Sequence, residues 1–213
     1  MKLGNLFQSG KTTRILYGSD FHGSDVVYRK FLSAAFQYQA DILIVGGDVT
    51  GKAMVPVIYH GNGTFTSSLF GKDLSANNTE ALEKIKKDIS SVGFYPIIIG
   101  QAEADELEND PVKMASRFEA EMCQRIREWM QLADEKLTPN KKTLFFMAGN
   151  DDLASIDETI AEYKNIHNPD LARFEIEGGY DVIGLSYANM TPWRCARDLE
   201  EEDLKAKLDQ LKG

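Results

Sequence analysis

Cysteine and histidine are scarce in this chain. Its 213 residues include only two cysteines and three histidines. Cys123 and Cys195 lie far apart and match neither the spacing of a zinc site nor that of a redox motif. So little cysteine is typical of a reducing compartment, and we therefore expect a cytoplasmic protein.

Long apolar runs and excess positive charge are also missing. No stretch approaches the roughly 18 consecutive apolar residues of a membrane span. The first residues, MKLGNLFQSGK, lack the apolar stretch and cleavage site of a signal peptide, so we expect no membrane association. The 24 basic and 33 acidic residues give a net charge of −9. This charge argues against non-specific binding of nucleic acid, but it permits a phosphorylated substrate, because bound metal ions reverse the local charge.

The residues that are present suit a single α/β domain over 1–213. A hydrophobic share of 43% can support a sizeable core. Apolar runs at 15–17 and 42–45 predict buried strands, and the helical spacing of apolar residues at 27–38 predicts a helix between them. Strand, helix and strand in this order form a βαβ unit with a parallel pair of strands.

The pattern changes after this unit. Two strand-like runs around Gly-Asn-Gly predict a hairpin insertion near 53–75, and the acidic stretch 103–110 is typical of a solvated surface segment. Further helices are predicted at 78–91, from Asp110-Pro111 onward, at 156–163 and at 200–213, and further strands at 97–99, 143–147 and 181–189. The helix that starts at Asp110 carries an apolar stripe that predicts core residues: Ala115, Phe118, Met122, Ile126, Trp129 and Ala133.

The sequence SGKTT at 9–13 resembles the end of a phosphate-binding P-loop. That motif needs a glycine at position 5, where this chain has asparagine. It also needs a helix after the loop, where the apolar pattern predicts a strand. We therefore reject a P-loop nucleotide switch.

Polar residues follow three of the predicted strands. Asp20 and His22 follow the first, Asp48 follows the second, and Asn150 follows the strand at 143–147. Loops at the carboxyl ends of strands in an open α/β sheet gather around one crevice. Each motif alone has a plainer explanation: Asp48 caps a turn, or the run 150–152 caps the helix at 156–163. Together they favour a metal site, since carboxylates and imidazoles are good ligands for divalent ions.

This set of residues resembles the motifs of the calcineurin-like metallophosphoesterases. The family pattern is D-x-H, then G-D, then G-N-H-[DE], then a lone His, then G-H-x-H. Asp20-Phe21-His22, Gly47-Asp48 and Gly149-Asn150 match its first three parts. The resemblance covers the chain from about residue 14 to 190 and implies an α/β sandwich of two mixed sheets flanked by helices.

The resemblance also implies the roles of these residues. Asp20 and His22 would bind a first metal ion, Asp48 would bridge two ions, and Asn150 would bind the second ion through its amide oxygen. The cofactors would be two divalent ions of Mn, Fe, Zn or Ni, which activate water as a nucleophile. The implied activity is hydrolysis of a phosphate mono- or diester in a phosphorylated small molecule or a nucleotide.

Two neighbouring residues are further candidates. Asp151 replaces the family's histidine after asparagine, and a carboxyl group can protonate a leaving group only if its pKa is raised. Asp152 then occupies the usual acidic position of the motif. Lys52 is placed to reach a substrate phosphate, although a solvated lysine is the commoner case.

The lone histidine and the G-H-x-H pair have no counterpart here. The other histidines, His60 and His167, both lie beside turn signals, and we expect neither to be a ligand. The resemblance thus implies a longer gene product with a fold left incomplete at the C-terminus of this chain. We expect the 213 residues alone to bind at most one metal ion weakly, to have little activity and to aggregate. The alternative function is a non-catalytic binding or scaffold protein with a degenerate metal site.

Overall fold

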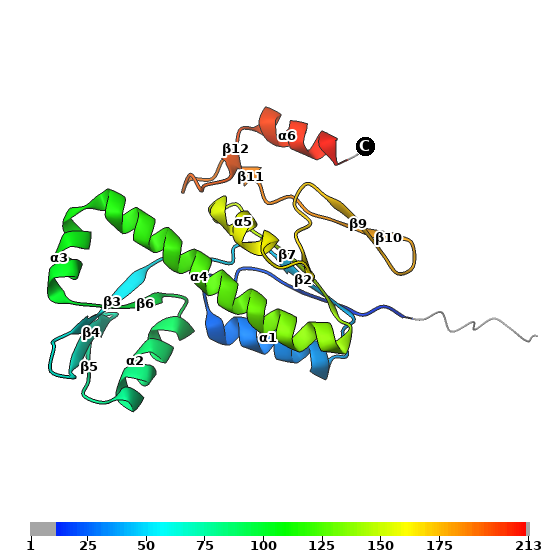
Figure 1. Ribbon diagram of the computed structural model, residues 1–213. Helices are drawn as coiled ribbons and strands as arrows, with labels where there is room; N and C mark the ends of the chain where they lie inside the picture. The colour runs from blue at the N-terminus through cyan, green and yellow to red at the C-terminus, as the bar shows by residue number, and fades with distance from the viewer. Residues whose placement is uncertain (1–11, 212–213) are drawn as a thin grey trace, which may run out of the picture.

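The computed structural model describes residues 12–211, and its centre is a parallel β-sheet (Figure 1). In the described chain this sheet has the order β1-β2-β7-β8. The strands are β1 (Ile15–Gly18), β2 (Ile42–Gly46), β7 (Thr143–Met147) and β8 (Ile166–His167). Helix α1 (Asp25–Gln37) connects β1 to β2, which pair in parallel with Ile15 opposite Ile42. The predicted βαβ unit is therefore confirmed.

Helices cover one face of the central sheet. The long helix α4 (Pro111–Leu137) begins at the predicted cap, because the Asp110 carboxylate accepts hydrogen bonds from the first turn. It crosses α1 and contacts the short helix α5 (Ser155–Ala161), as Figure 1 shows. Tyr28 of α1 stacks on Trp129 of α4 with ring centroids 4.3 Å apart, and both side chains are fully buried. This layer holds the main core.

A second sheet is inserted between β2 and β7. In the described chain its strands lie in the order β5-β4-β3-β6. The predicted hairpin corresponds to β3 (Met54–Tyr59) and the antiparallel β4 (Phe65–Leu69). The insertion is larger than 53–75, however. It adds β5 (Lys72–Ala76), α2 (Thr79–Ser91), β6 (Tyr95–Ile99) and α3 (Gln101–Asn109).

The other face of the central sheet carries a short hairpin. It consists of β9 (Arg173–Ile176) and β10 (Tyr180–Ile183), and Val182 packs with Ile42 and Phe145 of the sheet. The chain then forms β11 (Ala188–Asn189), β12 (Asp198–Leu199) and α6 (Glu201–Gln210). A 3-10 turn, η1 (Thr138–Asn140), follows α4. The fold is α/β, with parallel and antiparallel strands flanked by helices.

Three predicted elements differ from the structure. The strand expected at 181–189 is split, because Gly184 bonds to Pro169 and Ser186 bonds to Asp170 instead of continuing a ladder. The acidic stretch 103–110 is largely the helix α3, whose Leu107 is buried. Ala115 is exposed, so the buried part of the α4 stripe begins further along, with Phe118 partly covered.

Residues 9–11 of the rejected P-loop match and the whole segment searched for a signal peptide, 1–11, lie outside the described residues. The described part of the match, at 12–13, leads into β1 and not into a helix. Within residues 12–211, every helix is too short or too polar to cross a bilayer.

Candidate metal centre

Three side chains meet beyond the carboxyl ends of β1 and β2. Asp20, His22 and Asp48 each place one ligand atom so that these atoms all lie within 4.8 Å of one another. Asp20 is exposed, whereas the other two are partly buried. We name this group the carboxylate–histidine cluster. It brings together three of the four residues expected to be metal ligands.

The backbone of the cluster is held in an uncommon conformation. Asp20, His22 and Asp48 have φ angles of 58°, 43° and 52°, in the left-handed region that non-glycine residues seldom adopt. Such conformations persist only where the surroundings enforce them, and they gather at functional sites. Here the two loops bond to each other: Asp20 donates its N–H to Gly47 (3.0 Å) and His22 donates to Asp48 (3.0 Å).

A buried aromatic ring anchors the first loop. Phe21 lies between the two ligand candidates and is 4% exposed. Its ring packs edge-on against Phe31 and Trp129, with centroids 5.3 and 6.1 Å away. Because Phe21 is directed into the core, Asp20 and His22 are left on the side of the cluster. The D-x-H spacing therefore has a packing cause as well as a chemical use.

The loop after β7 touches the cluster through glycine. A Cβ atom on Gly149 would lie 2.1 Å from Oδ1 of Asp48, and one on Gly47 would lie 2.6 Å from the Cα of Gly149. Neither position has room for a side chain. The N–H of Asp151 also points to Oδ1 of Asp48, at 3.4 Å. The loop with Gly149, Asn150 and Asp151 is thus in direct contact with the second ligand loop.

The side chain of Asp152 holds these two loops together. It is fully buried and accepts hydrogen bonds from the backbone N–H groups of Gly149 (2.7 Å), Val49 (3.0 Å) and Thr50 (2.9 Å). The Thr50 hydroxyl donates to it as well, at 2.6 Å. The alternative that residues 150–152 cap the next helix is wrong, because the N-cap of α5 is Ala154 and has no side-chain cap within the described chain.

Asn150 is oriented by Asp198, a residue that the sequence did not single out. The Nδ2 group of Asn150 donates to Oδ1 of Asp198 at 2.9 Å. Because a carboxylate only accepts hydrogen bonds, this contact fixes which end of the amide faces Asp198. The amide oxygen, which is the expected ligand atom, is directed elsewhere.

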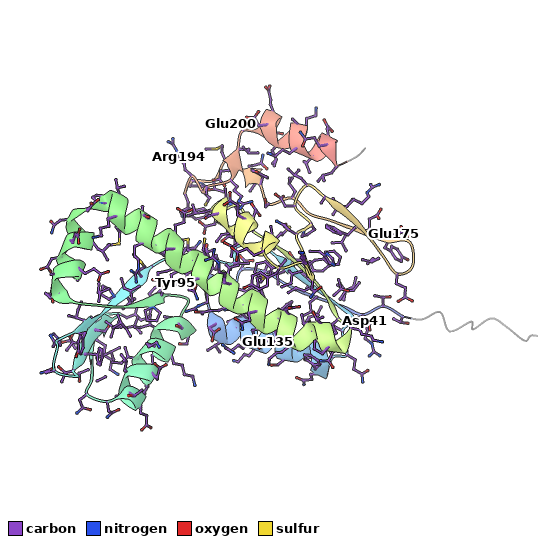
Figure 2. All side chains as sticks on the ribbon, viewed as in Figure 1. Asp41, Tyr95, Glu135, Glu175, Arg194 and Glu200 are labelled. Atoms are coloured by element: carbon purple, nitrogen blue, oxygen red, sulfur yellow. The ribbon has the colours of Figure 1, made fainter. Side chains whose placement is uncertain are left out.

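Asp198, the first residue of β12, is itself held firmly by the segment that connects β11 to β12. Its other oxygen accepts hydrogen bonds from Thr191 and from the N–H of Cys195 (2.8 Å). Burial raises the pKa of Asp198, but the hydrogen bonds from Thr191, Asn150 and Cys195 outweigh it and lower the pKa to about 2. Arg194 lies at the outer end of this segment (Figure 2). Asp198 is therefore an acceptor at every pH near neutrality.

Arg197 ties the same segment to the loop after β7. Its guanidinium is 5% exposed and donates to the carbonyl oxygens of Asp152 (2.9 Å) and Leu153 (2.8 Å). The guanidinium also pairs with Asp157 at 2.7 Å. The backbone N–H of Arg197 donates to the carbonyl oxygen of Asn150 at 2.8 Å. No local pattern points to Arg197, since these four partners lie 40 to 47 residues away along the chain.

Lys52 and Asp151 form an ion pair beside the cluster. The lysine side chain is 44% exposed and the aspartate side chain 32%. Both candidates therefore adjoin Asp48. His60 instead bonds to Thr66 in the β3–β4 hairpin, and His167 packs against Phe145 and Phe174.

The donor set of the cluster fits a cation. Nδ1 of His22 is buried and has no hydrogen-bond partner among residues 12–211. Burial raises the pKa of Asp48, and the negative charges of Asp152 and Asp20 raise it further. A bound cation would offset this repulsion and give His22 a partner, so the residues present fit a divalent ion.

Comparisons with known proteins give no family. No family model matches the chain, and no curated protein matches it. One solved structure is similar over 93% of this chain, with a TM-score of 0.47 and 16% sequence identity. The chain spans 63% of that structure's length. A likeness at these values supports no conclusion about family or function.

The raised pKa of Asp48 predicts a pH-dependent change in stability. A carboxyl group with a raised pKa in the folded state binds protons more tightly there, so it destabilises the fold as the pH rises through that pKa. In the presence of EDTA, Asp48→Asn should therefore increase the Tm near neutral pH, and the gain should vanish below about pH 4, near the ordinary Asp pKa. Thermal unfolding from pH 4 to 8 checks this, and a lower Tm of the variant at every pH contradicts it.

The contact with Asp198 predicts a positioning effect on metal binding. Asp198→Ala frees the amide of Asn150 to rotate, and loss of such an outer partner typically lowers metal affinity about 10–100-fold. Calorimetric titration with Mn²⁺ measures the change. Asp203→Ala, an exposed substitution in α6, is the control and should leave the affinity unchanged. Equal metal affinities in both variants would show that Asp198 does not position Asn150 for metal binding.

Proposed function

We propose that this chain carries the metal-binding part of a calcineurin-like metallophosphoesterase, with the two-sheet sandwich of that family. The activity would be hydrolysis of a phosphate mono- or diester. One observation carries the proposal: Asp20, His22 and Asp48 gather within 4.8 Å at one edge of the sheet, against the loop with Asn150. This arrangement agrees with the three motifs that the resemblance matched.

The proposed ligands divide between two divalent ions. Asp20, His22 and Asp48 would hold the first, and Asp48 and Asn150 the second. When bound, such ions activate water and offset the charge that builds up on the phosphoryl group. Asp198 keeps the amide of Asn150 oriented, and Asp152 holds the two ligand loops together.

Lys52 and Asp151 have different roles in this proposal. The carboxylate of Asp151 forms an ion pair with the ammonium group of Lys52. Asp151 is thus placed to orient Lys52 beside the cluster. Lys52 supplies the positive charge that attracts the substrate phosphate.

A second candidate function is a non-catalytic binding or scaffold protein. It is favoured by the places of His60 and His167, both of which lie outside the cluster. Among the described residues, the second ion is then left with Asp48 and Asn150. A shared carboxylate and one amide hold a transition metal weakly.

Titration of the purified chain with Mn²⁺, beside assays with bis-p-nitrophenyl phosphate and p-nitrophenyl phosphate, tests these functions. We expect weak metal binding and a low rate that Asp48→Ala abolishes. Metal binding with a rate no higher than that of Asp48→Ala would favour the scaffold. The absence of any metal binding would overturn the metal-dependent hydrolase and leave the scaffold.

A further inference from the structure

A separate pocket opens beside Lys52, between the inserted sheet and the start of α4. It encloses about 550 Å³, within the size range of small-molecule sites. In Figure 1, α3 and the first turns of α4 arch over one end of β3 and β6. Apolar side chains from these four elements form the walls, among them Met54, Ile97, Ile99, Leu107, Met114 and Phe118. We name this hollow the apolar pocket.

The inner wall of the apolar pocket is well packed. Ile97, Ile99 and Leu107 are each at most 4% exposed and form one buried group. Phe118 packs edge-on against buried Tyr95, with ring centroids 5.8 Å apart, and Figure 2 shows Tyr95 beside α4. The pocket therefore has a fixed apolar floor.

The outer wall, by contrast, is apolar but uncovered. Met114 is 37% exposed, and Ala115 is exposed although it continues the apolar stripe of α4. Both residues line the pocket. The stripe that predicted core residues here thus faces a hollow instead of a packed layer, which explains why that prediction was wrong for Ala115.

Lys52 links the apolar pocket to the candidate metal centre. It lines the pocket and forms the ion pair with Asp151. The N–H of Asp151 in turn points to Oδ1 of Asp48. The ammonium group of Lys52 therefore puts a positive charge at the end of the pocket that lies beside the proposed site of phosphate hydrolysis.

We propose that the apolar pocket holds the hydrocarbon chain of a substrate whose phosphate group lies at the carboxylate–histidine cluster. The proposal rests on the proposed function and narrows its substrate to an alkyl or acyl-chain phosphate ester. Of the described residues that line the pocket, two are charged, Lys52 and Glu108. The walls between them offer hydrocarbon and thioether groups, which suit an alkyl chain and leave the polar edge of a nucleobase without partners.

The test is a series of alkyl phosphates that differ only in chain length. Butyl, hexyl and octyl phosphate are titrated into the whole chain by calorimetry, in EDTA and in Mn²⁺. Each methylene that leaves water contributes up to about fourfold in affinity, so we expect a steep rise from butyl to octyl phosphate. Because the walls contain no proposed metal ligand, the rise should be the same in EDTA.

Two substitutions in α4 give a matched comparison. Met114→Glu puts a charge into the apolar pocket and should abolish the dependence on chain length. Val112→Glu puts the same charge on the same helix at a residue that is 80% exposed and does not line the pocket, and it should keep the dependence. Circular dichroism and Tm values confirm that both variants fold.

The outcomes separate this proposal from the proposed function. No dependence on chain length in the native protein, or an equal dependence in Met114→Glu, would overturn the apolar pocket as a chain site. A dependence that Met114→Glu removes, with octyl phosphate bound no more tightly in Mn²⁺ than in EDTA, would support the pocket and contradict the metal centre. Tighter binding in Mn²⁺ together with the chain-length dependence supports both.

Discussion

Replacing Asp48 by alanine is expected to abolish metal binding and phosphoester hydrolysis together. Asp48 contributes to the cluster and contacts the loop of Asn150, so in the proposed centre it serves both ions. Losing an outer partner of a ligand already costs about 10–100-fold in affinity, and losing the shared ligand should cost more than 100-fold. Titration with Mn²⁺ and a phosphodiester assay on the same preparation measure the two losses.

Two control variants make the result specific. Asp73→Ala removes an exposed carboxylate in β5 and should leave both measurements unchanged. Asp151→Ala should keep the metal affinity and lower the rate, because it breaks the contact with Lys52 without removing a proposed ligand. Hydrolysis that persists in Asp48→Ala after verified removal of metal would show that the centre lies elsewhere.

Replacing Asp152 by alanine is expected to cause the largest loss of stability. The change leaves the buried N–H groups of Gly149, Val49 and Thr50 without their acceptor. A buried donor left without its acceptor costs about 1–3 kcal/mol, so losing several at once should cost at least about 3 kcal/mol, which corresponds to a decrease in Tm of roughly 10 °C for a chain of this size. Urea unfolding, followed by circular dichroism, measures the difference.

The neighbouring Asp151→Ala is the matched control for stability. Its carboxylate is partly exposed and makes a surface ion pair, which is worth less than about 1 kcal/mol. Asp152→Asn is informative as well. It keeps the volume but replaces an acceptor by an NH₂ group among N–H donors. If Asp152→Ala lowers the free energy of unfolding no more than Asp151→Ala does, Asp152 does not hold the two loops together.

Three of the four described strands of the central sheet were predictable because each is a continuous apolar run; β8, which consists of Ile166 and His167, was not. β2 and β7 are largely buried, as predicted. The prediction of a buried strand at 15–17 was wrong, because β1 lies at the edge of the sheet and leaves Ile15 50% and Tyr17 62% exposed. Polar residues follow all three strands. The carboxylate–histidine cluster could therefore be inferred from three short motifs. β5 could not, since KDLSA is largely polar and forms a strand through its pairing with β4.

The residues that hold the site in place could not be inferred from the sequence, and the reason is a different one. Asp198 and Arg197 act on Asn150 and Asp152 across more than 40 residues of chain, and local periodicity says nothing about such contacts. Asp152 was expected to be an acidic motif residue or a helix cap, but its role depends on N–H groups that approach from the loop after β2. The close approach of Gly149 to Asp48 likewise exists only once the sheet has formed.

The contact between Asn150 and Asp198 has a consequence for the order of events on the ribosome. Asp20, His22 and Asp48 all leave the ribosome early, and the strands that carry them pair directly. The hydrogen-bond partner of Asn150, Asp198, lies 48 residues further along the chain and is synthesised later. At roughly 5–20 residues per second, synthesis supplies Asp198 about 2–10 s after Asn150. During that interval the nascent chain can expose the three proposed ligand side chains to cellular metal before the fourth proposed ligand is oriented.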